Sequence, residues 1–455
     1  MARTLIKNAC IVTVDSALGD INGGDILIEN DRIAAVGRNL QAGDAETIDA
    51  SGMIAMPGLI NAHIHTWEIG LRGIGANWAG GDYFRHLHHN MVDLYQPQDN
   101  YIANLMGSLS QINGGTTTIF DWCHNLRTPD QSDASIDGLE ESGIRAVFGH
   151  GTTKSPPKPG ETPFWEIPHP DAEIRRLRTG RLASDDRLVT LAMCILGPDE
   201  STYEVTAHDI RLAREYGLIT SAHTWGRAPR INDRGMFRLA ADGLLGPDHN
   251  ITHGNNLADD ELKVTIDAGV SITATPSTEM LNTSHIALLG RVLDLGGRPS
   301  LGTDVDAYMT GSMLALMRDA FQLQRMADNR KLDEQDQWPA KRHRMRPRMV
   351  LEWATMENAK ALRLDHKIGS LTPGKQADIV LIRKDDIGIF PAEDPIHVIV
   401  MYCETADVDT VFVAGKKVKA NGKLVYDPAL LEKKKQELAQ SRQRIFTAGK
   451  FVYAE

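Results

Sequence analysis

Cysteine is scarce in this sequence, and the four cysteines lie far apart without a C-x-x-C pair. This spacing provides neither the neighbouring thiolates of a zinc–cysteine site nor the disulfide framework of a small secreted domain. We therefore expect reduced thiols and a cytoplasmic protein. The four residues are Cys10, Cys123, Cys194 and Cys403.

The sequence also lacks a long apolar run and an excess of positive charge. No run of about 18 apolar residues is present, so we predict no transmembrane span. Residues 1–9 contain no long apolar segment, so we predict no signal peptide. The net charge of -11 argues against a nucleic-acid backbone or an anionic membrane surface as a partner.

The composition is that of an ordinary globular protein, with 42% apolar and 24% charged residues. A chain of 455 residues is too long for one ordinary hydrophobic core. We predict a large α/β domain together with a smaller one.

Both ends of the chain consist of short β-rich segments. Residues 1–57 contain several such runs separated by turn residues, and residues 371–427 repeat the pattern. Neither part has enough apolar residues for its own core, so we expect the two to combine into one composite β-sandwich. Residues 428–455 are expected to form a charged helical tail on the outside.

The middle of the chain, residues 58–370, alternates apolar β-like runs with helical segments. This alternation predicts a parallel sheet, and eight strand candidates fit a (β/α)8 TIM-type barrel. The candidates are residues 58–65, 115–120, 145–149, 188–196, 219–222, 250–252, 270–274 and 299–302.

Histidines and an aspartate stand where these strands end. His63 and His65 are two apart, so on a strand both imidazoles reach the same side. His223, His253 and Asp304 end three further strand candidates. Any one of them could be a hydrogen-bonded core residue or a helix cap. Functional side chains of such barrels gather at the carboxyl ends of the strands, so the joint pattern favours one metal site.

An ordered series of motifs now points to a family. The chain resembles metal-dependent hydrolases of the amidohydrolase superfamily, particularly the cytosine/guanine deaminase and triazine hydrolase branch. The similarity spans nearly the whole chain. Its motifs are Pro57 to His65, Leu71-Arg72-Gly73, Gly114 to Thr118, Ala222-His223, Thr252-His253-Gly254, Gly302-Thr303-Asp304 and Ile368 to Val380.

This resemblance implies a single divalent metal held by His63, His65, His223 and Asp304, with a bound water as the nucleophile. Asp304 would also take the proton from that water, and His253 would hold the attacking water or the polarised substrate atom. Zinc is the expected metal, although iron, cobalt or manganese also suit nitrogen and oxygen ligands. The resemblance further implies a homo-oligomer.

One position departs from the deaminase pattern. Those deaminases carry a glutamate three residues after the histidine of the fifth strand, whereas this chain has Gly226 there. Losing a positioned acid typically costs about 10²–10⁴-fold in rate. Glu279 is a candidate replacement acid or a contact for a cationic substrate, or else a solvent-facing loop residue. Glu68 and Asp121 are weaker candidates, and Asp121 could instead orient a ligand histidine.

Aromatic residues fall in the expected loops at the barrel mouth. Trp67, Trp122 and Trp225 could form an apolar pocket for a flat ring, although tryptophan is also a normal core residue. His88 lies in a short histidine-rich segment that we expect to form a helix over the mouth. It could contact the substrate or lie on a surface helix.

The sequence therefore predicts a metal-dependent hydrolase acting on a non-peptide C–N bond of a small aromatic or N-heterocyclic compound. Deamination of an aminoheterocycle by metal-bound hydroxide is the first choice. Gly226 keeps hydrolysis of an amide, urea, carbamate or halogenated ring as an alternative. A catalytically silent barrel that binds metal is a third possibility.

Overall fold

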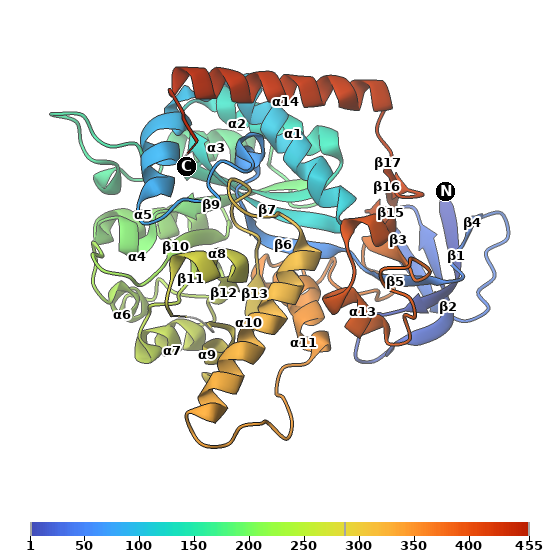
Figure 1. The fold of residues 1–455 in the computed structure, drawn as a ribbon. Coiled ribbons are helices and arrows are strands. Elements are labelled where there is room, and N and C mark those ends of the chain that lie inside the picture. Colours follow the sequence, from blue (N-terminus) through green and yellow to red (C-terminus); the bar gives the residue numbers. More distant parts are fainter. Residues whose placement is uncertain (1, 286–287, 454–455) are drawn as a thin grey trace.

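Eight parallel strands form the centre of the molecule in the computed structural model, which describes residues 2–285 and 288–453. They are hydrogen-bonded in chain order, and helices surround them (Figure 1). The predicted (β/α)8 TIM-type barrel is confirmed. The strands are β6 (Leu59–Ile64), β7 (Thr116–Leu126), β8 (Arg145–Thr152), β9 (Val189–Ile195), β10 (Thr220–Thr224), β11 (His249–His253), β12 (Ser271–Ala274) and β13 (Pro299–Leu301).

The first and last strands meet at a seam, which we define as residues 59–65 and 299–304. The backbone N–H of Asp304 donates to the carbonyl of His63 at 2.9 Å, and the N–H of His65 donates to the carbonyl of Asp304 at 2.9 Å. The side chain of Asn358 accepts from the N–H of Leu301 at 2.7 Å and donates to the carbonyls of Ile60 and Leu301. The seam thus brings three candidate ligands together.

Helices alternate with the barrel strands. Proline at the first position and a capping box between Gln96 and Asp99 explain where α1 begins, and left-handed Gly143 ends α2. Among the described residues, no helix has the length and apolar character needed to cross a bilayer. The helices are α1 (Pro97–Asn113), α2 (Pro129–Ser142), α3 (Asp171–Thr179), α4 (Gly197–Glu200), α5 (Tyr203–Glu215), α6 (Gly235–Ala241), α7 (Asp259–Asp267), α8 (Pro276–Asn282), α9 (Leu288–Asp294), α10 (Met313–Asp333), α11 (Pro347–Glu352) and α12 (Asn358–Ala361).

Strands from both chain ends build a second sheet beside the barrel (Figure 1). Strand β5 (Met53–Pro57) pairs antiparallel with β14 (Ile379–Arg383), so the prediction that both chain ends build one domain is confirmed. Their strands form a single connected sheet. Its own core contains Ile6, Ile26 and Phe412. The remaining strands are β1 (Arg3–Ile11), β2 (Ile21–Glu29), β3 (Arg32–Gly37), β4 (Glu46–Asp49), β15 (Val408–Val413), β16 (Lys416–Ala420) and β17 (Lys423–Leu424), with helix α13 (Pro395–Met401) between β14 and β15.

The tail contains a long helix, α14 (Pro428–Ala448), which lies across α1 (Figure 1). The hydroxyl of Ser441 donates to Asp99 at 2.6 Å, and Arg444 forms an ion pair with the same carboxylate. Arg442 donates to the carbonyl of Arg72 at 2.9 Å. These contacts hold the helix against the segment that follows the first barrel strand.

Candidate active site

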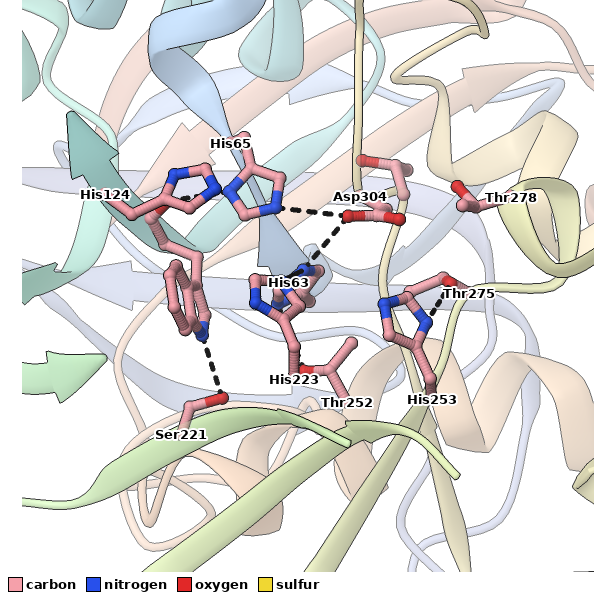
Figure 2. Close-up of polar contacts among 12 residues, drawn as sticks. His63, His65, His124, Ser221, His223, Thr252, His253, Thr275, Thr278 and Asp304 are labelled. Atoms are coloured by element: carbon pink, nitrogen blue, oxygen red, sulfur yellow. Dashed lines mark hydrogen bonds and ion pairs between the residues drawn. The ribbon is translucent and has the colours of Figure 1, made fainter. Parts of the chain in front are cut away.

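Four side chains predicted as metal ligands converge at the carboxyl end of the barrel. His63 lies on β6, His65 follows it, His223 lies on β10, and Asp304 follows β13. One ligand atom from each lies within 4.8 Å of those from the other three. Figure 2 shows the three rings gathered beside the Asp304 carboxylate. The barrel therefore brings together residues that are up to 241 positions apart.

Hydrogen bonds fix how these rings face the centre. Nδ1 of His65 donates to the carbonyl of Trp122 at 2.7 Å, and Nδ1 of His63 lies 3.2 Å from the hydroxyl of Thr252. Both contacts leave Nε2 directed inwards. Nε2 of His223 lies 3.3 Å from Nε2 of His63. Nitrogens directed at one point are well satisfied by a shared cation, so the donor set fits a metal.

Burial sets the charges of this centre. It lowers the pKa of His63 to about 4 and the pKa of His223 well below its usual value, so both imidazoles are neutral. Burial alone would raise the pKa of Asp304, but hydrogen bonds from His63 and His65 hold it well below its usual value. Burial alone would lower the pKa of His65, but its contact with Asp304 and the nearby Glu68 carboxylate raise it. A divalent transition metal at this point would bind all three histidines in their neutral form, beside the Asp304 carboxylate.

Two residues of the site have left-handed backbones. Asp304 has φ of 68° and His253 has φ of 75°, and neither is glycine. Such conformations cost energy and persist where the surrounding structure holds them, which is common at functional sites. The hydrogen bonds of the seam provide that restraint for Asp304.

Glu279 is buried behind His253 rather than exposed on a loop. Its Oε1 accepts from the N–H of Thr275 at 2.8 Å, and the Thr275 hydroxyl lies 3.0 Å from Nδ1 of His253. Oε1 itself is 3.8 Å from that Nδ1. The carboxylate favours the tautomer with hydrogen on Nδ1, which leaves Nε2 facing the site. Glu279 therefore reaches His253 through Thr275 and does not line the substrate cavity of this site.

A cavity of about 320 Å³ opens beside the four ligands. His88 and Trp225, both predicted to contact substrate, line it, and the Trp225 ring stacks on His253 at 3.8 Å between ring centroids. Such stacked rings offer a flat face to a bound heterocycle. Other lining residues include His124, Lys154, Asp199, Glu200, Arg227 and Tyr308.

Trp67 and Trp122 are fully buried and do not belong to the cavity lining. The indole of Trp67 donates to Nδ1 of His124 at 3.1 Å, and that of Trp122 donates to Ser221 at 3.2 Å. The Trp122 ring packs 4.1 Å from His223 between centroids. The two tryptophans were predicted to contact the substrate. In the structure they instead contact the histidines of the site, Trp67 with His124 and Trp122 with His223.

Two acidic residues noted in the sequence are also buried near the ligands. Asp121 accepts from the N–H of Thr66 at 3.1 Å, and burial raises its pKa to about 6. It restrains the backbone next to His65 rather than a histidine ring. Glu68 accepts from the hydroxyl of Tyr83 at 2.6 Å, and burial raises its pKa to about 8.

His124 and Lys154 are site residues that the sequence analysis missed. The predicted strand 115–120 stops short of β7, which continues through Trp122 and His124. The His124 ring stacks on His65 at 4.2 Å between centroids. Lys154 stands two residues beyond β8, so inspection of every strand end, not only those with histidine or aspartate, would have found it.

The backbone conformation explains why glycine occupies position 226. Its φ is +69°, and a Cβ placed there would lie 2.5 Å from the backbone nitrogen of Leu257. Its N–H donates to the carboxylate of Asp199 at 2.7 Å. A glutamate at this position would require the backbone to move.

Comparisons with known sequences agree with this geometry. Residues 54–424 match the Amidohydrolase family. The 5'-deoxyadenosine deaminase of Methanothermobacter thermautotrophicus is 30% identical over 437 residues, covering 93% of this chain and 95% of that protein. The 5-methylthioadenosine/S-adenosylhomocysteine deaminase of Pyrococcus furiosus is 26% identical over 430 residues, covering 92% and 96%.

Solved structures share the fold over the same length. An adenosine deaminase from Xanthomonas campestris with bound zinc has a TM-score of 0.81 at 21% identity and covers 98% of this chain and 99% of its own. An atrazine chlorohydrolase from Arthrobacter aurescens complexed with zinc has a TM-score of 0.77 at 23% identity, covering 97% and 100%. At these identities the likeness concerns the fold.

Proposed function

The chain belongs to the amidohydrolase family, and from this premise we propose that it hydrolyses the bond between a ring carbon and the exocyclic amino group of a small N-heterocycle and releases ammonia. The observation that carries the proposal is the convergence of His63, His65, His223 and Asp304, of which the last three line a cavity together with Trp225. Ligands and substrate space are thus adjacent.

We assign one divalent metal to this centre, with zinc as the first choice and iron, cobalt or manganese as alternatives. Nε2 of His63, His65 and His223 and the carboxylate of Asp304 would hold it. When bound, the metal would activate a water for attack on an sp² carbon. Asp304 would receive a proton at its carboxylate, and Nε2 of His253 would hold a polar atom of the substrate.

The relatives suggest where to look for the substrate. Several are named as deaminases of adenine nucleosides. A cavity of about 320 Å³ is at the small end of ligand pockets, and the stacked Trp225 ring suits a planar base. Gly226 favours a second candidate, hydrolysis of an amide, urea, carbamate or halogenated ring, because some of these leaving groups need less help from an acid.

The test is turnover by the purified, metal-loaded protein. We expect ammonia from at least one of 5'-deoxyadenosine, 5'-methylthioadenosine, an aminopyrimidine or an aminotriazine, and none after chelation. Chloride from a chlorotriazine without ammonia from any amino compound would replace deamination by the second candidate. Metal binding without turnover of any compound would identify a silent barrel.

We propose a cytoplasmic homo-oligomer whose partner is a small-molecule substrate, with no nucleic-acid or membrane partner. Light scattering on the purified protein measures the assembly, and a monomer at micromolar concentration would contradict it.

A further inference from the structure

Deamination leaves one chemical task without a residue. The departing nitrogen must take up a proton as the C–N bond breaks, and a positioned acid typically contributes about 10²–10⁴-fold to such a step. Gly226 has no side chain, and Glu279 is bonded to Thr275 outside the cavity lining. The proton must come from another group that faces the substrate.

Lys154 and His223 both line the cavity. The Lys154 side chain is only 4% exposed, and its Nζ lies 5.9 Å from the ring centroids of both Trp122 and Phe84. Trp122 in turn packs against the His223 ring. After burial, the Lys154 ammonium is the main cause that lowers the pKa of His88 on the same wall. Lys154 is therefore a buried cation of the cavity lining.

Glu200 forms an ion pair with Nζ of Lys154 and also lines the cavity. It ends the short helix α4, next to Asp199, which binds the N–H of Gly226. These two neighbouring carboxylates connect the end of β8 with the segment after β10. Gly226 is thus connected, through the adjacent residues Asp199 and Glu200, to the ion pair between Lys154 and Glu200.

Other polar groups of the lining are less suited to give up a proton. Arginine is not deprotonated in proteins, which excludes Arg227. Burial lowers the pKa values of His88 and His124 well below the usual range, so both rings are neutral. The hydroxyl of Tyr83 already donates to Glu68 at 2.6 Å. Lys154 combines a positive charge, a place on the wall and a transferable proton.

We infer that Lys154, held by Glu200, is the catalytic residue that protonates the departing nitrogen in the deamination proposed above. An N–H bond of Lys154 breaks, an N–H bond forms on the departing nitrogen, and the C–N electron pair leaves with that nitrogen. The attacking water supplies the hydroxyl to the ring carbon, and its released proton, taken up first by the Asp304 carboxylate, restores the lysine ammonium. The sum is one amine and one water giving one hydroxyl compound and ammonia.

The experiment compares leaving groups that differ in their need for a proton. A 6-aminopurine nucleoside requires protonation of the departing nitrogen, whereas the 6-chloro analogue loses chloride without it. For Lys154→Met we expect kcat on the amino compound to fall by about 100-fold or more. On the chloro compound it should change less than about threefold, and metal content should match the parent protein. Equal losses on both compounds would overturn the assignment.

Lys154→Arg keeps the charge and the pairing with Glu200 but cannot release a proton. It should lose as much amino-compound activity as Lys154→Met, and it decides the question if the methionine variant does not fold. Restored activity in the arginine variant would reduce Lys154 to electrostatic support and overturn the proton-donor role. The matched control is Lys158→Met, an exposed lysine of the same loop, which should behave as the parent protein.

The inference rests on the proposed function, but the two fail differently. A parent protein that releases ammonia from no amino compound would refute the proposed deamination. A parent protein that deaminates while Lys154→Met retains full kcat would refute only the role of Lys154.

Discussion

The backbone conformation at position 226 favours glycine over any other residue. A left-handed φ costs a non-glycine residue about 1–2 kcal/mol, and here a Cβ would also meet the backbone of Leu257. We expect Gly226→Ala to lower the free energy of unfolding by about 2 kcal/mol or more. Urea denaturation measures the change.

The matched control is Gly217→Ala. Its φ is +66° with no atom within 4 Å of an added Cβ, so only the backbone cost applies. A smaller loss there than at Gly226 is the expected order. Equal losses would mean that the backbone of Leu257 moves aside, and Gly226→Glu would then be a feasible restoration of the deaminase pattern.

The four ligand side chains should act as a unit. We expect His63→Ala, His223→Ala and Asp304→Ala each to lose both metal and activity, because three ligands hold a divalent ion less tightly than four. Metal content by mass spectrometry and ammonia release are the two measurements. Retention of a full equivalent of metal in Asp304→Ala would remove that residue from the ligand set.

Substitution of Glu279 should lower the catalytic rate without changing the metal content. Glu279→Gln removes the charge that favours hydrogen on Nδ1 of His253, so we expect full metal content and kcat lower by about 10-fold. The control Glu204→Gln changes an exposed glutamate and should have no effect. Full activity in Glu279→Gln would exclude it from the mechanism.

At the scale of single elements, the end of β8 is joined to the loop before α3 by two buried histidines. Nδ1 of His150 lies 2.9 Å from Nε2 of His169, and the backbone N–H of His169 donates to Asp209 on α5 at 2.8 Å. Burial lowers the pKa of His150 to about 4 and that of His169 to about 3. Both are therefore neutral in the folded protein at neutral pH.

This pair predicts a loss of stability in mild acid. Above pH 6.5 the rings are neutral in both folded and unfolded chains. As pH falls below about 6.5, the unfolded chain takes up protons that the folded protein does not, so stability falls by up to about 1.4 kcal/mol per pH unit for each histidine. The loss levels off below the folded pKa values.

His169→Gln keeps a hydrogen-bond donor for His150 and removes one titrating ring. We expect the fall in Tm between pH 7 and pH 5 to be smaller in this variant than in the parent, as measured by calorimetry. His366→Gln, at an exposed position, should leave that fall unchanged. An equal fall in His169→Gln would show that other groups govern acid stability.

The elements also show what the sequence could predict. Apolar runs located all eight barrel strands, because buried parallel strands are nearly continuous apolar segments. Polar residues at strand ends pointed to one cluster, and the family resemblance then implied which of them bind the metal, namely His63, His65, His223 and Asp304. The length of β7 could not be read from Trp122 and His124, since neither is a typical apolar strand residue. Lys154 and Glu200 are 46 positions apart and come together only in the folded protein.

For the whole molecule, the proposed ligands lie on both sides of the seam. His63 and His65 belong to the first strand and Asp304 follows the last, so a bound ion would link the two edges of the barrel. A ligand at 100 times its Kd stabilises the folded state by about 2.7 kcal/mol. We expect chelation to lower Tm and to speed amide hydrogen exchange in residues 59–65 and 299–304 more than in β1–β3. Uniform exchange changes would contradict a local link.

The pairing of β5 with β14 has a consequence for synthesis on the ribosome. Strand β5 leaves the exit tunnel long before its partner β14, because the entire barrel is translated in between. An unpaired strand edge is prone to association with other chains. We therefore expect a nascent chain arrested before Ile379 to leave this edge of β5 unpaired and to associate with other chains more readily than the full-length protein.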